Sequence, residues 1–290
     1  MNAPFLINGH RDGATAPISR SRGADAARHP DRQRRWGAAL VRALLGIGGL
    51  VVVFLLWWMG TDLLAEPTGF IRHFSPASAL SSLAELLTGS DLTTHALVSL
   101  RRILVGLAFA LLIGVPVGLA VGSLSLLEAS TTPAFQFLRM ISPLSWMPIA
   151  VMVFGVGDKP IYFLLAFAAV WPILLNTAAG VRQLDPNWLQ LARSLAATRW
   201  ETLSRVVIPG VLSHVLTGIR LAIGIVWIVL VPCEMLGVSA GLGYFILDTR
   251  DRLAYSELMA TVLLIGLLGF VLDALARSLL RLVGAAPRAR

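Results

Sequence analysis

Long runs of apolar residues, separated by short polar segments, make up most of this 290-residue chain. A helix that crosses the hydrocarbon core of a bilayer needs about 20 largely apolar residues. Six stretches meet that requirement, over residues 38–60, 103–124, 135–155, 160–181, 206–235 and 258–276. The pattern predicts an all-α polytopic membrane protein with about six transmembrane helices. Six crossings would place both termini on one side of the membrane.

Two local features modify this prediction. The third stretch contains Pro143 and Pro148, and because proline interrupts the hydrogen bonding of a helix, we expect a kink or a break there. Between the first two stretches, Ser75 followed by Pro76 is a helix-start signal, and leucines follow it at helical spacing. We therefore expect a short helix on the outer surface.

The composition excludes a water-soluble globule. Hydrophobic residues make up 56% of the chain, charged residues 14%, and the mean hydropathy is +0.76. The net charge of +8 follows membrane topology, since the basic residues lie in tails and short loops and form no continuous nucleic-acid-binding patch. In a six-span topology, 17 lysines and arginines fall on the side of the termini and six on the other, and Arg220 lies within a span. The positive-inside rule therefore places both termini in the cytoplasm.

The N-terminal segment differs from the rest. It carries eight arginines by residue 42 and has no periodic apolar positions. We expect residues 1–37 to be a disordered basic cytoplasmic tail, residues 38–283 to form one transmembrane domain, and residues 284–290 to form a short cytoplasmic tail.

The polar segment from Asp185 to Gly210 has explicit helix signals and is expected to face the cytoplasm. Asp185 can cap a helix that begins at Pro186, and Thr198 with Glu201 forms a capping box at the start of a second short helix. Each helix has an apolar face, with Trp188, Leu191, Ala192 and Leu195 on the first and Trp200, Leu203 and Val207 on the second. These faces either rest on the membrane surface or on the protein's own spans, or they dock a partner protein.

The same loop resembles the cytoplasmic Glu-Ala-Ala loop of permeases of ATP-binding-cassette (ABC) importers. That signature reads Glu-Ala-Ala, three residues, Gly, nine residues, then Ile-x-Leu-Pro. Aligned on Pro209, this chain carries Gln190, Leu191, Ala192, Ala196, Val206 and Ile208 at its positions. Gln190 replaces the glutamate, Leu191 an alanine and Ala196 the glycine. The resemblance continues through residues 217–251 and 257–273, covers about residues 80–283, and is to the nitrate, sulfonate and taurine branch of the family.

The resemblance implies the transmembrane permease subunit of an ATP-driven importer in the bacterial inner membrane. Cytoplasmic ATPase subunits would grip the loop over residues 185–205, a periplasmic binding protein would deliver the solute, and two copies of the chain would enclose the pathway. The residues that the resemblance assigns to coupling are Asp185, Trp188, Gln190, Ala192, Ala196, Thr198, Trp200, Glu201 and Pro209. Lys159 is the only lysine and Pro160 follows it, so the chain has no GxxxxGK[ST] phosphate loop. ATP and magnesium are therefore expected on the partner ATPase, with no cofactor and no enzyme activity in this chain.

A few polar residues fall within the predicted spans. Arg220 lies eleven residues past Pro209, about 16 Å along a helix, and it either lines the pathway and favours anions or is a structural arginine in a bundle contact. Asn176 either lines a polar cavity or bonds to a neighbouring helix. We expect an interfacial or structural role for Glu234, and an ion pair between Asp273 and Arg277, four residues apart.

Rival functions have weaker support in the sequence. An ATP-independent secondary transporter needs titratable carboxylates at mid-depth, which the predicted spans lack, and a channel is the other alternative. An enzyme or a metal site needs clustered acids, bases or ligands, but the five histidines do not pair at ligand spacing and Cys233 is the only cysteine. The resemblance and Arg220 favour a small anionic solute of the nitrate, sulfonate or taurine class, and the sequence does not say which.

Overall fold

The computed structural model describes residues 30–64 and 69–284, and all the elements assigned within these ranges are helical. The chain separates into two units at Trp57 and Trp58. The first unit contains most of α1 (Pro30–Trp58), which the short π-helix η1 (Met59–Leu63) follows. Residues 30–37, expected in the tail, are thus helical; the expected tails over residues 1–29 and 285–290 lie outside the described residues.

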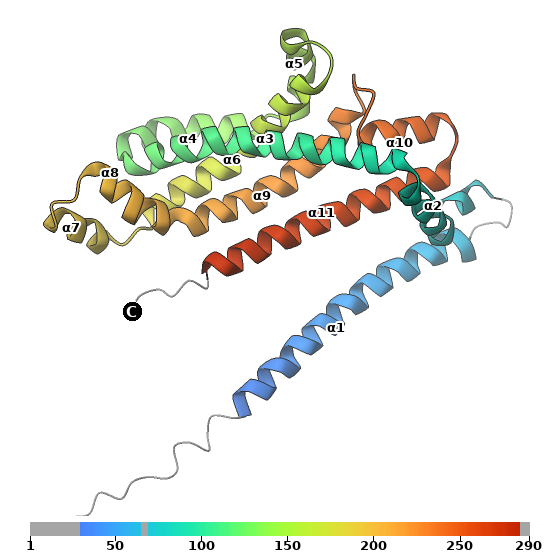
Figure 1. Ribbon diagram of the computed structural model, residues 1–290, viewed down its shortest axis with the longest axis horizontal. Helices are drawn as coiled ribbons and strands as arrows, with labels where there is room; N and C mark the ends of the chain where they lie inside the picture. The colour runs from blue at the N-terminus through green and yellow to red at the C-terminus, as the bar shows by residue number, and fades with distance from the viewer. Residues whose placement is uncertain (1–29, 65–68, 285–290) are drawn as a thin grey trace, which may run out of the picture. The chain divides into compact units, whose positions relative to one another are not determined.

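Four long helices form the centre of the second unit: α3 (Ser90–Ser123), α6 (Asp158–Arg182), α9 (Ile208–Glu234) and α11 (Tyr255–Gly284) (Figure 1). They pack in the order α3, α6, α9, α11, and the most buried of them is α6. Leu164, Leu165 and Ala169 of α6 are fully buried, as are Ala222 and Leu230 of α9. This burial identifies α6 as the central helix.

Glycines allow α3 to approach α6 closely. A Cβ atom on Gly106 would lie 2.6 Å from the Leu165 Cβ, and one on Gly118 would lie 2.7 Å from the carbonyl oxygen of Leu174. One turn further on, a Cβ atom on Gly122 would lie 2.7 Å from the carbonyl oxygen of Ala178. Such small-residue contacts are common between membrane helices, because no water-driven force brings the helices together and close van der Waals packing does.

The third predicted span is broken. It consists of α4 (Ser125–Met140), the 3-10 turn η3 (Pro143–Trp146) and α5 (Met147–Phe154), and its two halves are bent by 84°. The break falls at Pro143, as expected. An ion pair between Glu128 and Arg182 joins the start of α4 to the end of α6. By length and composition, the described residues hold five helices able to cross a membrane, or six if the bent pair is one span.

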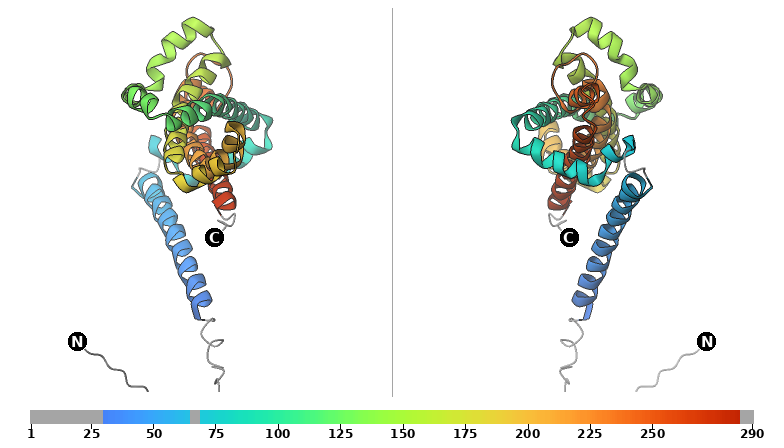
Figure 2. Two further views of the ribbon diagram at one scale, coloured as in Figure 1. Left: turned by 90° about the vertical axis from the view of Figure 1, so that its left-hand side faces the viewer. Right: turned by 90° about the vertical axis from the view of Figure 1, so that its right-hand side faces the viewer.

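Short elements lie at the two ends of the bundle. At the end that we name the α10 end lie η2 (Phe70–Phe74), α2 (Pro76–Thr88) and α10 (Leu242–Asp251). The predicted start of α2 is confirmed, since the Ser75 side chain accepts a hydrogen bond from the amide of Ser78. The opposite end, named the loop end, carries α7 (Pro186–Ser194) and α8 (Arg199–Thr202), and the left view of Figure 2 looks at the bundle from this end.

Candidate functional site

The loop between α6 and α9 has the helix caps that its sequence predicts. The Asp185 side chain accepts a hydrogen bond of 2.9 Å from the amide of Asn187, which starts α7. The Thr198 hydroxyl accepts from the amide of Glu201, and the Glu201 carboxylate accepts from the amide of Thr198, so the capping box is complete. These bonds satisfy backbone donors that a helix start leaves free.

The second predicted short helix is not a separate element. The π-helix η4 (Leu203–Val207) joins α8 to α9, and Thr202, Leu203 and Ile208 all have right-handed helical dihedral angles. A helical path therefore runs from Arg199 to Glu234. A displacement of α8 would pass directly into the span, because no flexible joint separates them.

The apolar side chains of this loop are exposed in the single chain. The exposed fractions of Trp188, Leu191, Leu195 and Trp200 are 52%, 51%, 73% and 72%, whereas Ala192 is 6% exposed and packs inward. The interpretation that these faces rest on the protein's own spans is therefore wrong for the four large residues. Gln190 and Pro209 are also exposed. The loop end presents an apolar surface that burial against another body would stabilise.

Ala196 occupies a backbone conformation that usually requires glycine. Its φ is 51°, in the left-handed region. The amide of Ala197 donates a hydrogen bond to the carbonyl oxygen of Ala192, and the amide of Ala196 donates one to the carbonyl oxygen of Arg193. These two bonds form a Schellman motif at the end of α7. The turn between α7 and α8 thus has the geometry of a glycine C-cap, although the glycine is absent.

Arg220 lies in an ion-pair cluster between α9 and α11. Its Nε is 2.9 Å from Asp273 Oδ1, and Arg277 Nη1 is 2.8 Å from Asp273 Oδ2. The predicted pair of Asp273 and Arg277 is therefore present, and the link to Arg220 was not predicted. The two arginines and one aspartate of this cluster carry one net positive charge. The side chains of Arg220 and Arg277 are 42% and 36% exposed.

Asn176 has a different partner from the two that the sequence suggested. Its Nδ2 donates a hydrogen bond of 2.7 Å to the carbonyl of Pro172 on the same helix, and its Cβ faces Gly218 of α9. Among the described residues, no hydrogen bond joins Asn176 to Arg220. The two pathway candidates therefore have separate hydrogen-bond partners.

A buried polar network at the α10 end escaped the sequence reading. Arg101 and Arg102, expected outside the second span, lie within α3, and the Arg102 side chain is 3% exposed. Arg102 bonds to Glu234 at 2.7 Å, to Asp158 at 2.6 Å and to the carbonyl of Ala240 at 2.7 Å. Its side chain therefore ties α3 to both neighbouring helices and to the loop before α10.

Glu234 is fully buried within this network, so its role is structural. Its carboxylate accepts hydrogen bonds from the Ser99 hydroxyl and from the amide of Gly243, and the Ser99 hydroxyl in turn accepts from the amide of Leu242. His95 Nδ1 accepts from the amide of Gly241. The sequence signal for this site is the glycine-rich segment after Glu234. A side chain at Gly241 would collide with the Glu234 carboxylate, and one at Gly243 would collide with the Val231 carbonyl oxygen and the Glu234 Cβ.

Comparisons with known proteins agree with this architecture. Residues 110–288 match a family described as the binding-protein-dependent transport system inner membrane component. The bicarbonate transport system permease protein CmpB of Synechococcus elongatus is 35% identical over 257 residues, covering 84% of this chain and 90% of that protein. The taurine transport system permease protein TauC of Escherichia coli is 30% identical, covering 86% and 92%. The nitrate import permease protein NrtB of Synechococcus elongatus is 33% identical, covering 69% and 73%.

A solved structure supports the fold independently. A chain of the MetNI methionine ABC transporter, in an inward-facing conformation, superposes with a TM-score of 0.55 at 14% sequence identity, covering 66% of this chain and 95% of that one. At this identity the likeness concerns the fold alone.

Proposed function

The chain belongs to the family of binding-protein-dependent transport system inner membrane components and is a translocation subunit of an ABC importer, and we propose that its solute is a small oxyanion or a solute that carries an oxyanion group. Relatives that transport bicarbonate, nitrate and taurine share 30–35% of its sequence over most of its length. Bicarbonate, nitrate and the sulfonate of taurine share a compact, planar or tetrahedral oxyanion. This shared chemistry is the observation that carries the proposal.

The loop over residues 185–205 is, in this proposal, the site that binds the ATPase subunits. The support is the exposed apolar surface of Trp188, Leu191, Leu195 and Trp200, which stands on a helix continuous with a span. ATP and magnesium bind to the partner ATPase, and closure of the partners is transmitted as a displacement of α8 and α9. A periplasmic binding protein delivers the solute at the α10 end.

Two copies of the chain enclose the pathway, with both termini of each in the cytoplasm. The support for a homodimer is the exposed surface of the broken span, because α4 contains no buried residue and Met152 and Val153 of α5 are 85% and 68% exposed. The support for the orientation is the excess of arginine on the side of the loop end. Arg220 faces the pathway, where its cluster supplies one net positive charge for an anion.

The decisive experiment combines assembly with transport. The intact chain and the Trp188→Ala/Trp200→Ala double variant are purified from native membranes in mild detergent, with Trp58→Ala as the matched control for loss of an exposed tryptophan. We expect the double variant to lose the ATPase subunit and ATP-dependent uptake of the oxyanion, since truncation of a central interface tryptophan costs about 2–4 kcal/mol of binding free energy. Uptake that continues without any ATPase would contradict the proposal and favour a secondary transporter or a channel.

A further inference from the structure

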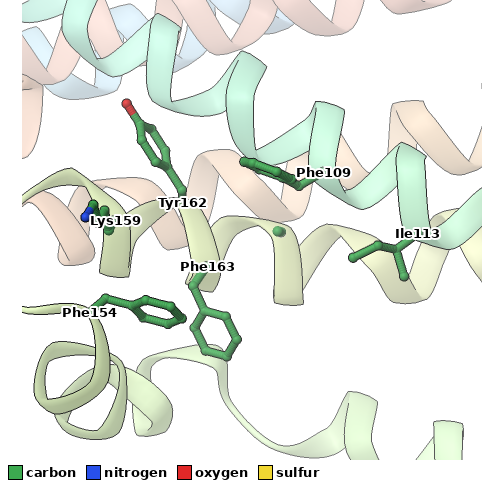
Figure 3. A pocket seen from close by; sticks show the side chains of 7 residues that line it. Phe109, Ile113, Phe154, Lys159, Tyr162 and Phe163 are labelled. Carbon is green, nitrogen blue, oxygen red and sulfur yellow. The ribbon is translucent and has the colours of Figure 1, made fainter.

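An apolar slot of about 370 Å³ lies between α3, α5 and α6. Figure 3 shows Phe109 and Ile113 on α3, Phe163 on α6 and Phe154 at the end of α5, with Lys159 at one extremity of the slot and Ile113 at the other. Phe109, Ile113 and Phe154 are 49%, 52% and 42% exposed, so the slot opens at the surface of the single chain. Its volume is in the range of pockets that hold small molecules.

The lining residues of the slot extend along the axis of α6. Its lining runs from Lys159 to Ala166 along α6, seven residues, or about 10 Å at 1.5 Å per residue. Lys159 is the second residue of the 25-residue helix α6, which places its ammonium near the polar boundary of the bilayer while the rest of the slot extends inward. The lining thus has a cation at the membrane surface and apolar walls below it.

The charges nearby leave Lys159 available. The adjacent carboxylate of Asp158 is held by Arg101 at 2.5 Å and by Arg102 at 2.6 Å. Within residues 30–64 and 69–284, no hydrogen bond or ion pair engages the Lys159 ammonium. Lys159 also lies in the first turn of α6, and both its charge and the positive end of the helix dipole favour an anion there.

From this arrangement we propose that the slot is a binding site for one acyl chain of an anionic phospholipid, whose headgroup phosphate pairs with Lys159. In a bilayer an open apolar slot is filled by lipid or by protein. A protein surface would have to bring a carboxylate to Lys159 at the membrane boundary, whereas a phospholipid supplies its phosphate at that depth with the acyl chain directly beneath it. The bound lipid would stabilise the contact between the end of α5 and the start of α6, where the Phe154 and Phe163 rings lie 5.5 Å apart.

Native mass spectrometry of the detergent-purified complex tests the proposal, with phosphatidylglycerol and phosphatidylcholine of identical acyl chains as probes. We expect the intact protein to retain phosphatidylglycerol in preference to phosphatidylcholine. Lys159→Gln should reduce that preference roughly fivefold, the effect of removing one basic residue at a lipid surface. Ala166→Leu should reduce retention of both lipids, because the added side chain fills the slot.

Matched controls separate this site from general effects. Arg250→Gln removes a basic residue at the same end of the bundle, and Leu112→Phe enlarges an exposed α3 side chain outside the slot; neither should change retention. Unchanged lipid preference in Lys159→Gln together with unchanged retention in Ala166→Leu would overturn the proposal. Copurification of the ATPase subunit in the same variants reports separately on importer assembly.

A second measurement needs no substitution. A phosphatidylglycerol with a photoactivatable acyl chain is irradiated with the intact complex, and peptides are mapped by mass spectrometry. We expect adducts at Phe109, Ile113 or Phe163. Adducts found only at other residues would show that the slot holds no phospholipid chain. A disulfide between two copies of an Ile113→Cys/Phe154→Cys variant would instead show that a second copy of this chain occupies the slot.

Discussion

Replacing Glu234 by glutamine tests the buried network at the α10 end directly. The carboxylate is fully buried and accepts hydrogen bonds from Arg102 at 2.7 Å, from Ser99 at 2.8 Å and from the amide of Gly243 at 3.0 Å. Glutamine keeps the shape but removes the charge, and it puts an NH₂ group where one accepting oxygen stood. At least one of the three donors therefore loses its acceptor, and Arg102 keeps only Asp158 as a charged partner.

The size of the effect follows from these losses. A buried donor without a partner costs about 1–3 kcal/mol, and breaking a buried ion pair by removing one member costs about 3–5 kcal/mol in total. We expect Glu234→Gln to destabilise the protein by an amount within the second range. At about 2–4 °C per kcal/mol, the apparent Tm should fall by roughly 10 °C.

Thermal unfolding of the purified chain in detergent measures this change. Glu257→Gln is the matched control, because Glu257 lies at the same end, is partly exposed and reaches Arg252 only at 3.4 Å. We expect it to change stability by less than about 0.5 kcal/mol. An Arg102→Met/Glu234→Leu double variant should lose less than Glu234→Gln, since apolar side chains of similar volume leave no unpaired buried charge.

The reasoning would be refuted by two results. The first is an unchanged Tm in Glu234→Gln, which would mean that the carboxylate does not stabilise the fold. The second is a double variant whose loss of stability exceeds the sum of the losses in the two single variants. Removal of one partner should already abolish the interaction, so the loss in the double variant should be smaller than that sum.

Three further predictions concern the packing and the loop end. Ala196→Gly should stabilise the end of α7 by about 1 kcal/mol, because glycine adopts φ 51° without steric cost, and amide hydrogen exchange at the turn should slow roughly fivefold. Gly118→Leu should lower the Tm by overpacking the contact of α3 with α6, whereas Gly266→Leu, where nothing lies within 4 Å, should not. Arg220→Gln should reduce ATP-driven oxyanion uptake roughly tenfold with assembly intact, while Asp273→Asn should lower the KM, because it frees Arg220 from its carboxylate partner.

Local sequence signals predicted the apolar spans and the starts of the three capped short helices. Apolar runs located the spans because the length of a crossing is set by the bilayer. The caps at Ser75, Asp185 and Thr198 formed as expected, since a side-chain cap depends on residues only two or three positions away. The break at Pro143 follows from the same kind of local chemistry.

What the sequence did not predict depends on contacts between distant residues. The second span was expected to begin at residue 103, because Arg101 and Arg102 interrupt the apolar run, yet α3 begins at Ser90. Arg102 can lie inside the bundle because two distant carboxylates pair with it, Glu234 at 132 positions and Asp158 at 56 positions along the chain. Hydropathy penalises each charge separately, so it cannot recognise a pair that forms in the folded chain.

The charges of α9 are held under different physical conditions along the helix, and this difference bears on which part moves. At the α10 end, Glu234 is surrounded by three donors from α3 and α10, and any displacement there would expose a buried charge to an apolar environment without a partner. Near the middle of α9, Arg220 and its partners Asp273 and Arg277 are partly exposed in the single chain, so a change of partner there does not leave a fully buried charge unpaired. Rearrangement therefore costs less toward the loop end of α9, where the helix is continuous with α8 and its exposed Trp200.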